Sequence, residues 1–187
     1  ELSHFEKLKT KQDGPKTLWG EIATYVVPDK NEIWNYGVPR PKGEEKHRHL
    51  YDNHGEYCME LLAAALHSML TNPTTQWFFF HTGNLELDAD PEVQEYLYKF
   101  SKSILNYLNN SNFQSEIHEV FLDLVSFGTA PMRIMPDEDD EFRFHSRPIY
   151  EIVIDEDHNG VVDYVGSVDE LTVKQAFGKY GKEAFGD

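Results

Sequence analysis

Hydrophobic residues recur at helical spacing through the first two thirds of the chain. Between residues 18 and 26 they share one face of a predicted helix that Pro28 ends. The run 61–66 is apolar on nearly every side, which is typical of a helix covered on most sides. Residues 93–108 and 117–124 repeat the helical spacing, so we expect this part of the chain to be mainly helical.

Capping and breaker residues predict where these helices begin and end. Asp13-Gly14-Pro15 separates two short helices near the start of the chain, because proline fits the first position of a helix. Asp90-Pro91 begins another helix, with the aspartate as its cap. Ser111 and Gln114 have the spacing of a capping box, and Gly128 fits the left-handed position that ends a helix.

Two aromatic segments depart from the helical pattern. Residues 76–80 are aromatic and are followed by Gly83, which predicts a strand buried on both faces or covered by another subunit. A long loop over residues 29–47 contains a further aromatic pair. A free surface would not tolerate this apolar area, so each segment belongs either to the core or to a subunit interface. The candidate interface residues are Trp34, Tyr36, Trp77, Phe78, Phe79 and Phe80.

Beyond residue 130 the hydrophobic period becomes strand-like. Strands are predicted over 131–135, 142–144, 150–154 and 161–168, with the acidic run 137–141 and the pair Asn159-Gly160 at turns. Asn159-Gly160 favours a type I′ hairpin, and Thr172 with Gln175 forms a capping box that begins a final helix. This order predicts an α+β fold in which amino-terminal helices pack on an antiparallel β meander.

We expect a single region over residues 1–187. It divides into a helical arm and loop (1–47), a helical core with one aromatic strand (48–130), and the meander with the final helix (131–187). The chain begins at Glu1 and stops at Asp187 without an obvious terminal element, so we expect a fragment of a longer chain.

The charge balance narrows the function classes. With 33 acidic and 17 basic residues, the formal net charge is −16, and the basic residues form no cluster along the sequence. Because nucleic-acid binding relies on basic groups that neutralise phosphates, this chain is not expected to grip DNA or RNA. One cysteine, Cys58, excludes an internal disulfide and suits a reducing cytoplasm. No apolar run approaches the roughly 20 residues of a membrane-spanning helix, so we expect a soluble protein.

One motif resembles a calcium-binding loop. Asp155, Asp157, Asn159 and Gly160 match its opening positions, where alternating oxygen side chains and a glycine wrap the backbone around the ion. The twelfth position is Gly166 instead of a bidentate glutamate, and apolar strands flank the motif. A hairpin explains the glycine without metal, so the hairpin is favoured and calcium stays as the alternative.

Other candidate chemistry is weaker. His47, His49 and His54 could hold zinc or copper, yet no thiolate or carboxylate accompanies them at a fixed spacing. The acids of 137–141 lie on one turn and diverge, whereas two-metal catalysis needs acids that converge from different elements. We therefore predict no catalytic residue, no metal site and no cofactor.

Two segments carry a resemblance to a known protein family. The first runs over residues 62–73 and continues at Trp77-Phe78, and the second runs over residues 111–130. Both resemble signatures of the phage portal proteins of the head-to-tail connecting family, in the family's order and at its spacing. Weaker matches at residues 23–28 and 171–178 extend the resemblance over most of the chain. One departure is Ala64-Ala65, where the family often has a small residue and glycine.

The resemblance implies a structural subunit of the ring at one capsid vertex through which viral DNA is packaged and ejected. Such portals form homo-oligomeric rings, expected here to be a dodecamer, that dock terminase, scaffold and tail adaptor proteins. DNA passes through the channel without tight binding, and a partner hydrolyses ATP. The implied location is the virion, after assembly in the host cytoplasm. Family members run to several hundred residues, so the chain resembles their amino-terminal third, mostly the outer wing.

Two other function classes remain open. The chain could be a monomeric acidic binding module that presents Trp34 and Tyr36 to a protein partner. It could also be a metal-dependent hydrolase built on the acids around residues 137 and 155, which would require a bound divalent metal.

Overall fold

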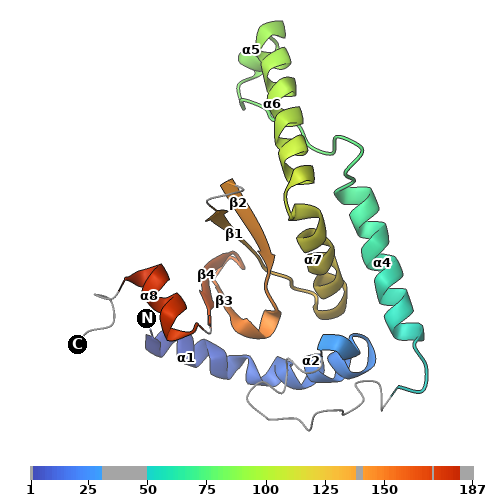
Figure 1. Ribbon diagram of the computed structural model, residues 1–187, viewed down its shortest axis with the longest axis vertical. Helices are drawn as coiled ribbons and strands as arrows, with labels where there is room; N and C mark the ends of the chain where they lie inside the picture. The colour runs from blue at the N-terminus through green and yellow to red at the C-terminus, as the bar shows by residue number, and fades with distance from the viewer. Residues whose placement is uncertain (1, 31–49, 138–140, 170, 182–187) are drawn as a thin grey trace. The chain divides into compact units, whose positions relative to one another are not determined.

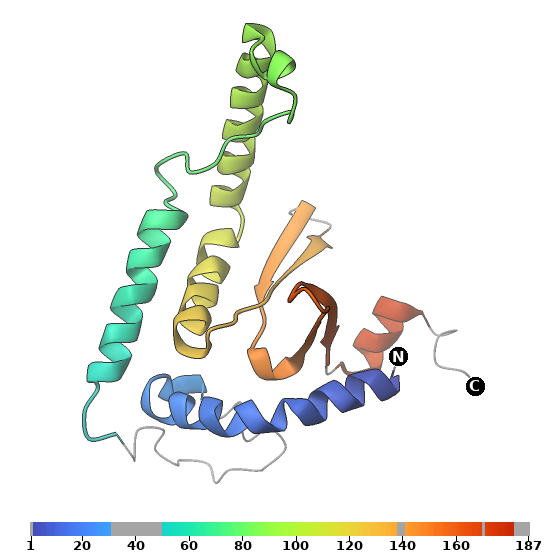
Figure 2. The same cartoon turned by 180° about the vertical axis from the view of Figure 1, so that it is seen from behind.

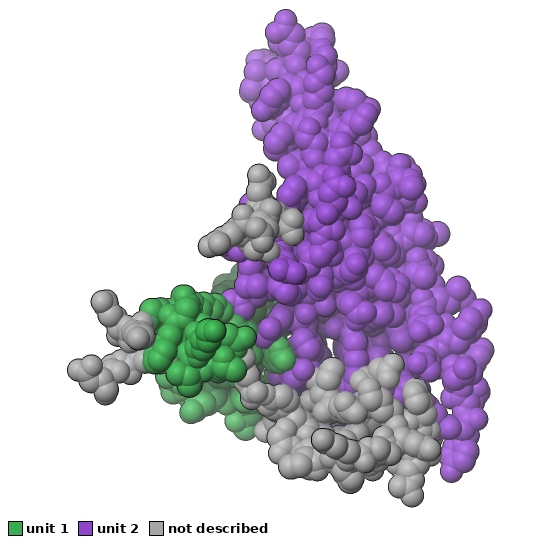
Figure 3. All heavy atoms as spheres, in the orientation of Figure 1, with its two compact units in different colours: residues 1–12, 151–187 green, residues 13–150 purple. Residues whose placement is uncertain are grey.

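The chain folds into helices and two small antiparallel sheets, so the predicted α+β class is confirmed. The computed structural model describes residues 2–30, 50–137, 141–169 and 171–181. The chain divides into two compact units, which Figure 3 shows in different colours. The smaller unit comprises residues 1–12 and 151–187, and the larger unit comprises residues 13–150.

Helices make up most of the larger unit (Figure 1). They are α2 (Asp13–Tyr25), the 3-10 helix η1 (Pro28–Lys30), α4 (His54–Leu70), α5 (Leu85–Asp88), α6 (Pro91–Asn110) and α7 (Phe113–Phe127). Two predicted helix ends are confirmed. Asp90 caps α6 by accepting the backbone N–H of Glu92, and Gly128 ends α7 with a left-handed φ of 78°.

The predicted capping box of Ser111 and Gln114 is wrong. Asn112, not Ser111, occupies the cap position of α7. The Gln114 side chain instead bonds to Asn109 and to His67, which lies on a different helix. The Gln114 amide is therefore bonded to Asn109 and His67 and does not bond back to the start of α7.

One hairpin completes the larger unit. Strand β1 (Met132–Asp137) pairs antiparallel with β2 (Glu141–Ser146), and Met132 lies opposite Ser146. Phe144 of β2 is buried, and its ring meets that of Phe113 edge to face at 5.1 Å between centroids. The hairpin therefore packs into the same hydrophobic core as α7.

Side chains from the helices occupy the second edge of β2. The Tyr107 hydroxyl bonds to both the N–H (2.8 Å) and the C=O (3.1 Å) of Phe142. The Asn112 amide does the same for Phe144, at 3.0 and 2.7 Å. These bonds satisfy backbone groups at every second residue, as a third strand would, and so protect an edge that could otherwise pair with another chain.

Helix α7 lies at the centre of the larger unit. Helix α4 lies beside it in both ribbon views (Figures 1 and 2), and α2, α6, β1 and β2 also contact it. Phe113 and Phe121 of α7 are buried, as are Met59 and Ala63 of α4. Helix α6 precedes α7 nearly end to end and carries α5 at its far end.

The smaller unit combines two helices with a second hairpin. Its elements are α1 (Leu2–Lys11), β3 (Ile152–Glu156), β4 (Val162–Ser167) and α8 (Val173–Tyr180), and the 3-10 helix η2 (Ile149–Glu151) leads into β3. Helix α1 packs on β3, where Gln12 donates to the carbonyl of Ile152 at 2.6 Å. The predicted capping box of Thr172 and Gln175 is present at the start of α8.

The antiparallel strands form two separate hairpins rather than one continuous meander. Within the described residues, β1 pairs with β2 and β3 pairs with β4, and no ladder joins β2 to β3. Pro148 lies between these two strands and has no N–H to donate. The turn of η2 follows directly, so the chain leaves the extended conformation that pairing requires.

The predicted hairpin at Asn159-Gly160 is confirmed, but its turn is not type I′. The N–H of Gly160 donates to the carbonyl of Asp157 at 3.0 Å, which places His158 and Asn159 at the centre of the turn. Gly160 follows with a left-handed φ of 76°, the arrangement of a three-residue loop with a bulge. The Asp157 carboxylate accepts the N–H groups of Val161 (3.0 Å) and Asn159 (2.8 Å), which hold its pKa below the usual range.

We predict that Asn112→Ala destabilises the larger unit by about 2 kcal/mol, because it leaves the N–H and C=O of Phe144 without their partners. Asn110→Ala, at an exposed position two residues earlier, is the control. Urea unfolding followed by circular dichroism measures both changes. Equal losses in the two variants would show that the Asn112 bonds contribute nothing beyond helix propensity.

Candidate functional site

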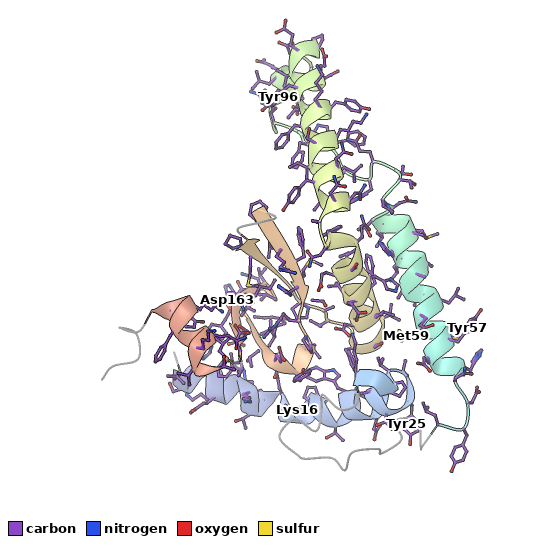
Figure 4. All side chains as sticks on the ribbon, in the orientation of Figure 1. Lys16, Tyr25, Tyr57, Met59, Tyr96 and Asp163 are labelled. Carbon is purple, nitrogen blue, oxygen red and sulfur yellow. The ribbon has the colours of Figure 1, made fainter. Side chains whose placement is uncertain are left out.

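The outer side of α4 is an apolar surface. Met59 and Ala63 face α7 and are buried, whereas Leu61 (58% exposed) and Met69 (80% exposed) lie on the other side of the helix with Tyr57 and Leu62. Figure 4 shows Met59 on the α7 side and Tyr57 on the opposite side. Within the described part of the chain, α4 is thus covered on one side, not on most sides as its composition predicts. We call Tyr57, Leu61, Leu62 and Met69 the outer α4 face.

Charged residues are absent from a long stretch that begins on α4. No aspartate, glutamate, lysine or arginine occurs from residue 61 to 85, although such residues make up 27% of the chain. The stretch includes most of the outer α4 face and the whole aromatic segment 77–80. The sequence analysis missed the outer α4 face. The signal that could have found it is this uncharged run combined with an all-round apolar helix.

The aromatic segment is not the predicted strand. Residues 76–82 have no strand partner among the described residues, and the segment is held instead by α6, where the N–H of Phe80 donates to the Ser101 hydroxyl at 3.1 Å. Ser101 is fully buried and in turn donates to the carbonyl of Leu97. A side chain on a helix thus takes the hydrogen bond that a neighbouring strand would have taken from Phe80.

The four aromatic side chains of the segment have different surroundings. Trp77 stacks on the buried ring of Phe113, with 10° between the planes, and meets Phe78 edge to face at 4.7 Å. Phe80 lies 5.1 Å from the ring of Phe100 on α6. Phe79 is 58% exposed. Trp77 therefore anchors the segment on the core, and Phe79 is its most exposed side chain. Trp34 and Tyr36 lie outside the described residues.

A groove of about 500 Å³ lies between the aromatic segment and α6. Phe79, Phe80, Leu85, Leu97 and Tyr98 are among the residues that line it. We call it the aromatic groove.

The loop at the rim of the groove is held by local hydrogen bonds. Asp88 accepts the hydroxyl (2.7 Å) and the N–H (2.9 Å) of Thr82, and these bonds lower its pKa. Asn84 caps α5 by accepting the N–H of Glu86, and Gln94 donates to the carbonyl of Asp88. The groove is therefore preformed, as binding sites usually are.

A buried ion pair fixes the end of η1 to α7. The Lys30 ammonium lies 2.5 Å from Asp123 and 3.1 Å from Glu119, one turn earlier on α7. Asp123 is only 5% exposed, and this burial raises its pKa, while the bond and charge of Lys30 oppose the rise. Lys30 thus compensates a carboxylate that would otherwise be costly to bury.

A chain of polar contacts fixes the end of α4. His67 bonds to Gln114 at 2.8 Å, Gln114 donates to Asn109 at 2.8 Å, and Asn109 donates to the carbonyl of Pro73 at 2.7 Å. The ring of His118 lies 5.5 Å from that of His67. Together with the packing on α7, these contacts give the outer α4 face a rigid support.

The structure offers little to hold a metal. Among the residues that it describes, no three His, Cys, Asp or Glu side chains gather as metal ligands would. In the calcium-like motif, both oxygens of Asp157 already accept protein N–H groups. His47, His49 and the acids at 138–140 lie outside the described residues. In the same described part of the chain, no helix is both long and apolar enough to cross a membrane.

Comparison with known proteins gives one family and two phage relatives. Residues 2–187 match the model of the family described as bacteriophage head to tail connecting protein. The chain is 29% identical to the probable portal protein of Bordetella phage BPP-1, over 97% of this chain and 32% of that protein. It is 22% identical to the portal protein of Salmonella phage epsilon15, over 96% of this chain and 32% of that protein. The chain thus spans about a third of the length of these relatives.

We predict that Lys30→Met destabilises the protein by about 3 kcal/mol at neutral pH, because it leaves Asp123 buried without its cation. The folded-state pKa of Asp123 then rises further above the unfolded value of about 3.9, so the folded protein binds the proton more tightly. The loss should therefore shrink as the pH falls through that folded-state pKa and grow as it rises.

Unfolding free energies between acid and neutral pH measure this effect. The exposed Lys102→Met is the control and should show no such pH dependence. Replacing both partners, as Lys30→Met with Asp123→Leu, should recover most of the lost stability. A loss for Lys30→Met that is the same at every pH would contradict an origin in the Asp123 charge.

We predict that Trp77→Ala lowers the free energy of unfolding by about 2 kcal/mol, because it removes the ring that stacks on Phe113. Phe79→Ala, the matched change at an exposed position of the same segment, should alter it by less than about 0.5 kcal/mol. Thermal unfolding of both variants measures the difference. If the two losses were equal, Trp77 would not be the anchor of the segment.

Proposed function

The chain belongs to the bacteriophage head-to-tail connecting family, and on that premise we propose that it is a structural subunit of a phage portal. The portal is the ring at one capsid vertex through which viral DNA is packaged and ejected. The observation that carries this proposal is the family match over residues 2–187, nearly the whole chain. The two relatives named as portal proteins support it. Because they are about three times as long, the proposal concerns the whole protein, of which this chain supplies the part resembling the outer wing.

Ring formation agrees with the apolar surface of the larger unit. A closed ring uses a heterologous contact, so each subunit needs two different patches that fit one another. The larger unit exposes two apolar areas, the outer α4 face and the aromatic groove with Phe79. The proposed interface residues remain Trp34, Tyr36, Trp77, Phe78, Phe79 and Phe80, of which Trp77 also stacks on Phe113.

The charge of the chain suits passage of DNA without tight binding. A net charge of −16 repels phosphate, which suits a part of the subunit that neighbours translocating DNA, because a basic surface would hold the DNA. The subunit is then non-catalytic, and a partner hydrolyses the ATP that drives packaging. Its partners are other copies of itself, expected to form a dodecamer, together with terminase, scaffold and tail adaptor proteins. It resides in the virion after assembly in the host cytoplasm.

Electron microscopy and mass photometry of the full product of this gene test the proposal. At increasing protein concentration we expect rings of about a dozen subunits with a central channel, because a heterologous contact that closes produces a ring of defined size. A protein that stays monomeric at every concentration would contradict the proposal and favour the binding module. ATPase or nuclease activity intrinsic to the purified protein would also contradict it.

A further inference from the structure

We infer that the outer α4 face of one subunit binds in the aromatic groove of the next subunit. This inference rests on the proposed ring and names the two patches that close it. The first patch is Tyr57, Leu61, Leu62 and Met69 on α4. The second is the groove between the aromatic segment and α6.

The composition of α4 shows that it needs a second neighbour. A helix that is apolar all round is stable in water only when other structure covers it on most sides. Helix α7 covers the side of Met59 and Ala63, while Leu61, Leu62 and Met69 remain at least half exposed. The outer α4 face therefore has the character of a buried surface that no described residue covers.

Electrostatics favour a second copy of this chain as that partner. This chain carries a net charge of −16, so two copies repel one another wherever the acidic surfaces of this part meet. The stretch from residue 61 to 85 is free of charged residues and supplies three of the four residues of the outer α4 face. The same stretch supplies Phe79, Phe80 and Leu85 of the groove. A contact between these two patches therefore takes no carboxylate from the stretch. The one carboxylate that lines the groove, that of Asp88, already accepts two hydrogen bonds from Thr82.

The two patches are also complementary in chemistry. Leucine and methionine side chains project from a helix and can fill a groove with walls such as Phe80, Leu97 and Tyr98. The groove is held open by the hydrogen bonds of Asp88 and Gln94, so binding does not have to order it. Because the patches differ, the contact continues from subunit to subunit and can close a ring, instead of stopping at a symmetric dimer.

A matched pair of substitutions tests the outer α4 face in the full gene product. Leu61 on α4 and Leu18 on α2 are helix-surface leucines with the same exposed fraction, 58%. Leu61→Glu would bury a carboxylate in the contact and weaken it by about tenfold or more, so that rings disappear at concentrations where the natural protein forms them. Leu18→Glu should assemble like the natural protein.

Two results for Leu61→Glu would overturn the inference. One is ring assembly equal to that of the natural protein. The other is a lowered melting temperature of the dissociated subunit, because the face would then be covered within the subunit itself. Mass photometry and thermal unfolding, measured on both variants, give these readouts.

Crosslinking tests the pairing of the two patches. Cys58 is the one cysteine of this chain and is exposed on α4 beside the outer face. Any cysteine elsewhere in the full gene product is first replaced by serine in both preparations. We mix this protein, which keeps Cys58, with a variant of it that carries Cys58→Ser and Tyr98→Cys, so that the variant's reactive cysteine lies in the groove. A short thiol crosslinker should then join the two preparations, because each covalent link is necessarily between subunits. Links mainly between Cys58 of two natural copies would show that the face pairs with itself and would overturn the inference.

These outcomes are distinguishable from a failure of the proposed function. If the natural protein forms no ring, the portal proposal fails and the inference fails with it. If the natural protein forms rings, while Leu61→Glu also assembles and no link to Tyr98→Cys forms, the pairing of patches is wrong and the portal proposal stands.

Discussion

The packing around α7 is the interaction on which the rest of the larger unit depends. Its apolar residues Phe113 and Phe121 form the core with α4, the aromatic segment and β2. Its polar residues serve neighbours that come from distant parts of the chain. Asp123 binds Lys30, and Glu116 accepts the N–H of Ser146 at the end of β2. One helix therefore aligns the elements that carry both exposed apolar patches.

This central role explains why so much hydrophobic surface stays exposed. A helix that contacts α2, α4, α6 and a hairpin can cover only one side of each, and on α4 the covered side is that of Met59 and Ala63. In a monomer, leucines on the opposite side would be a liability. In the proposed assembly of acidic subunits, an uncharged apolar face is where contact is least opposed by repulsion. The sequence pattern and the proposed assembly are thus explained by the same constraint.

Predictions of helix caps were right where the capping bond joins residues that are close in sequence. Asp90 caps its helix, Gly128 ends another, and Thr172 forms its box with Gln175, because each bond joins residues a few positions apart. Predictions failed where a distant group competed. Gln114 bonds to His67 instead of forming a cap, and the segment 76–80 takes Ser101 of α6 as its partner instead of a strand. Nothing within a short window of sequence reveals such a competitor.

The sequence by itself determined the α+β class, the family and the absence of charge over residues 61–85, because composition, order and spacing are properties of the chain alone. Only the tertiary structure decided which apolar residues of that stretch are exposed. Trp77 and Phe79 lie two positions apart and are both aromatic, yet Trp77 stacks on Phe113 and is 36% exposed, whereas Phe79 is 58% exposed. The same holds for Lys30 and Asp123, which are far apart in sequence and meet only because α7 brings them together. Burial and pairing depend on which groups lie opposite a side chain in space, and the order of residues along the chain does not reveal those groups.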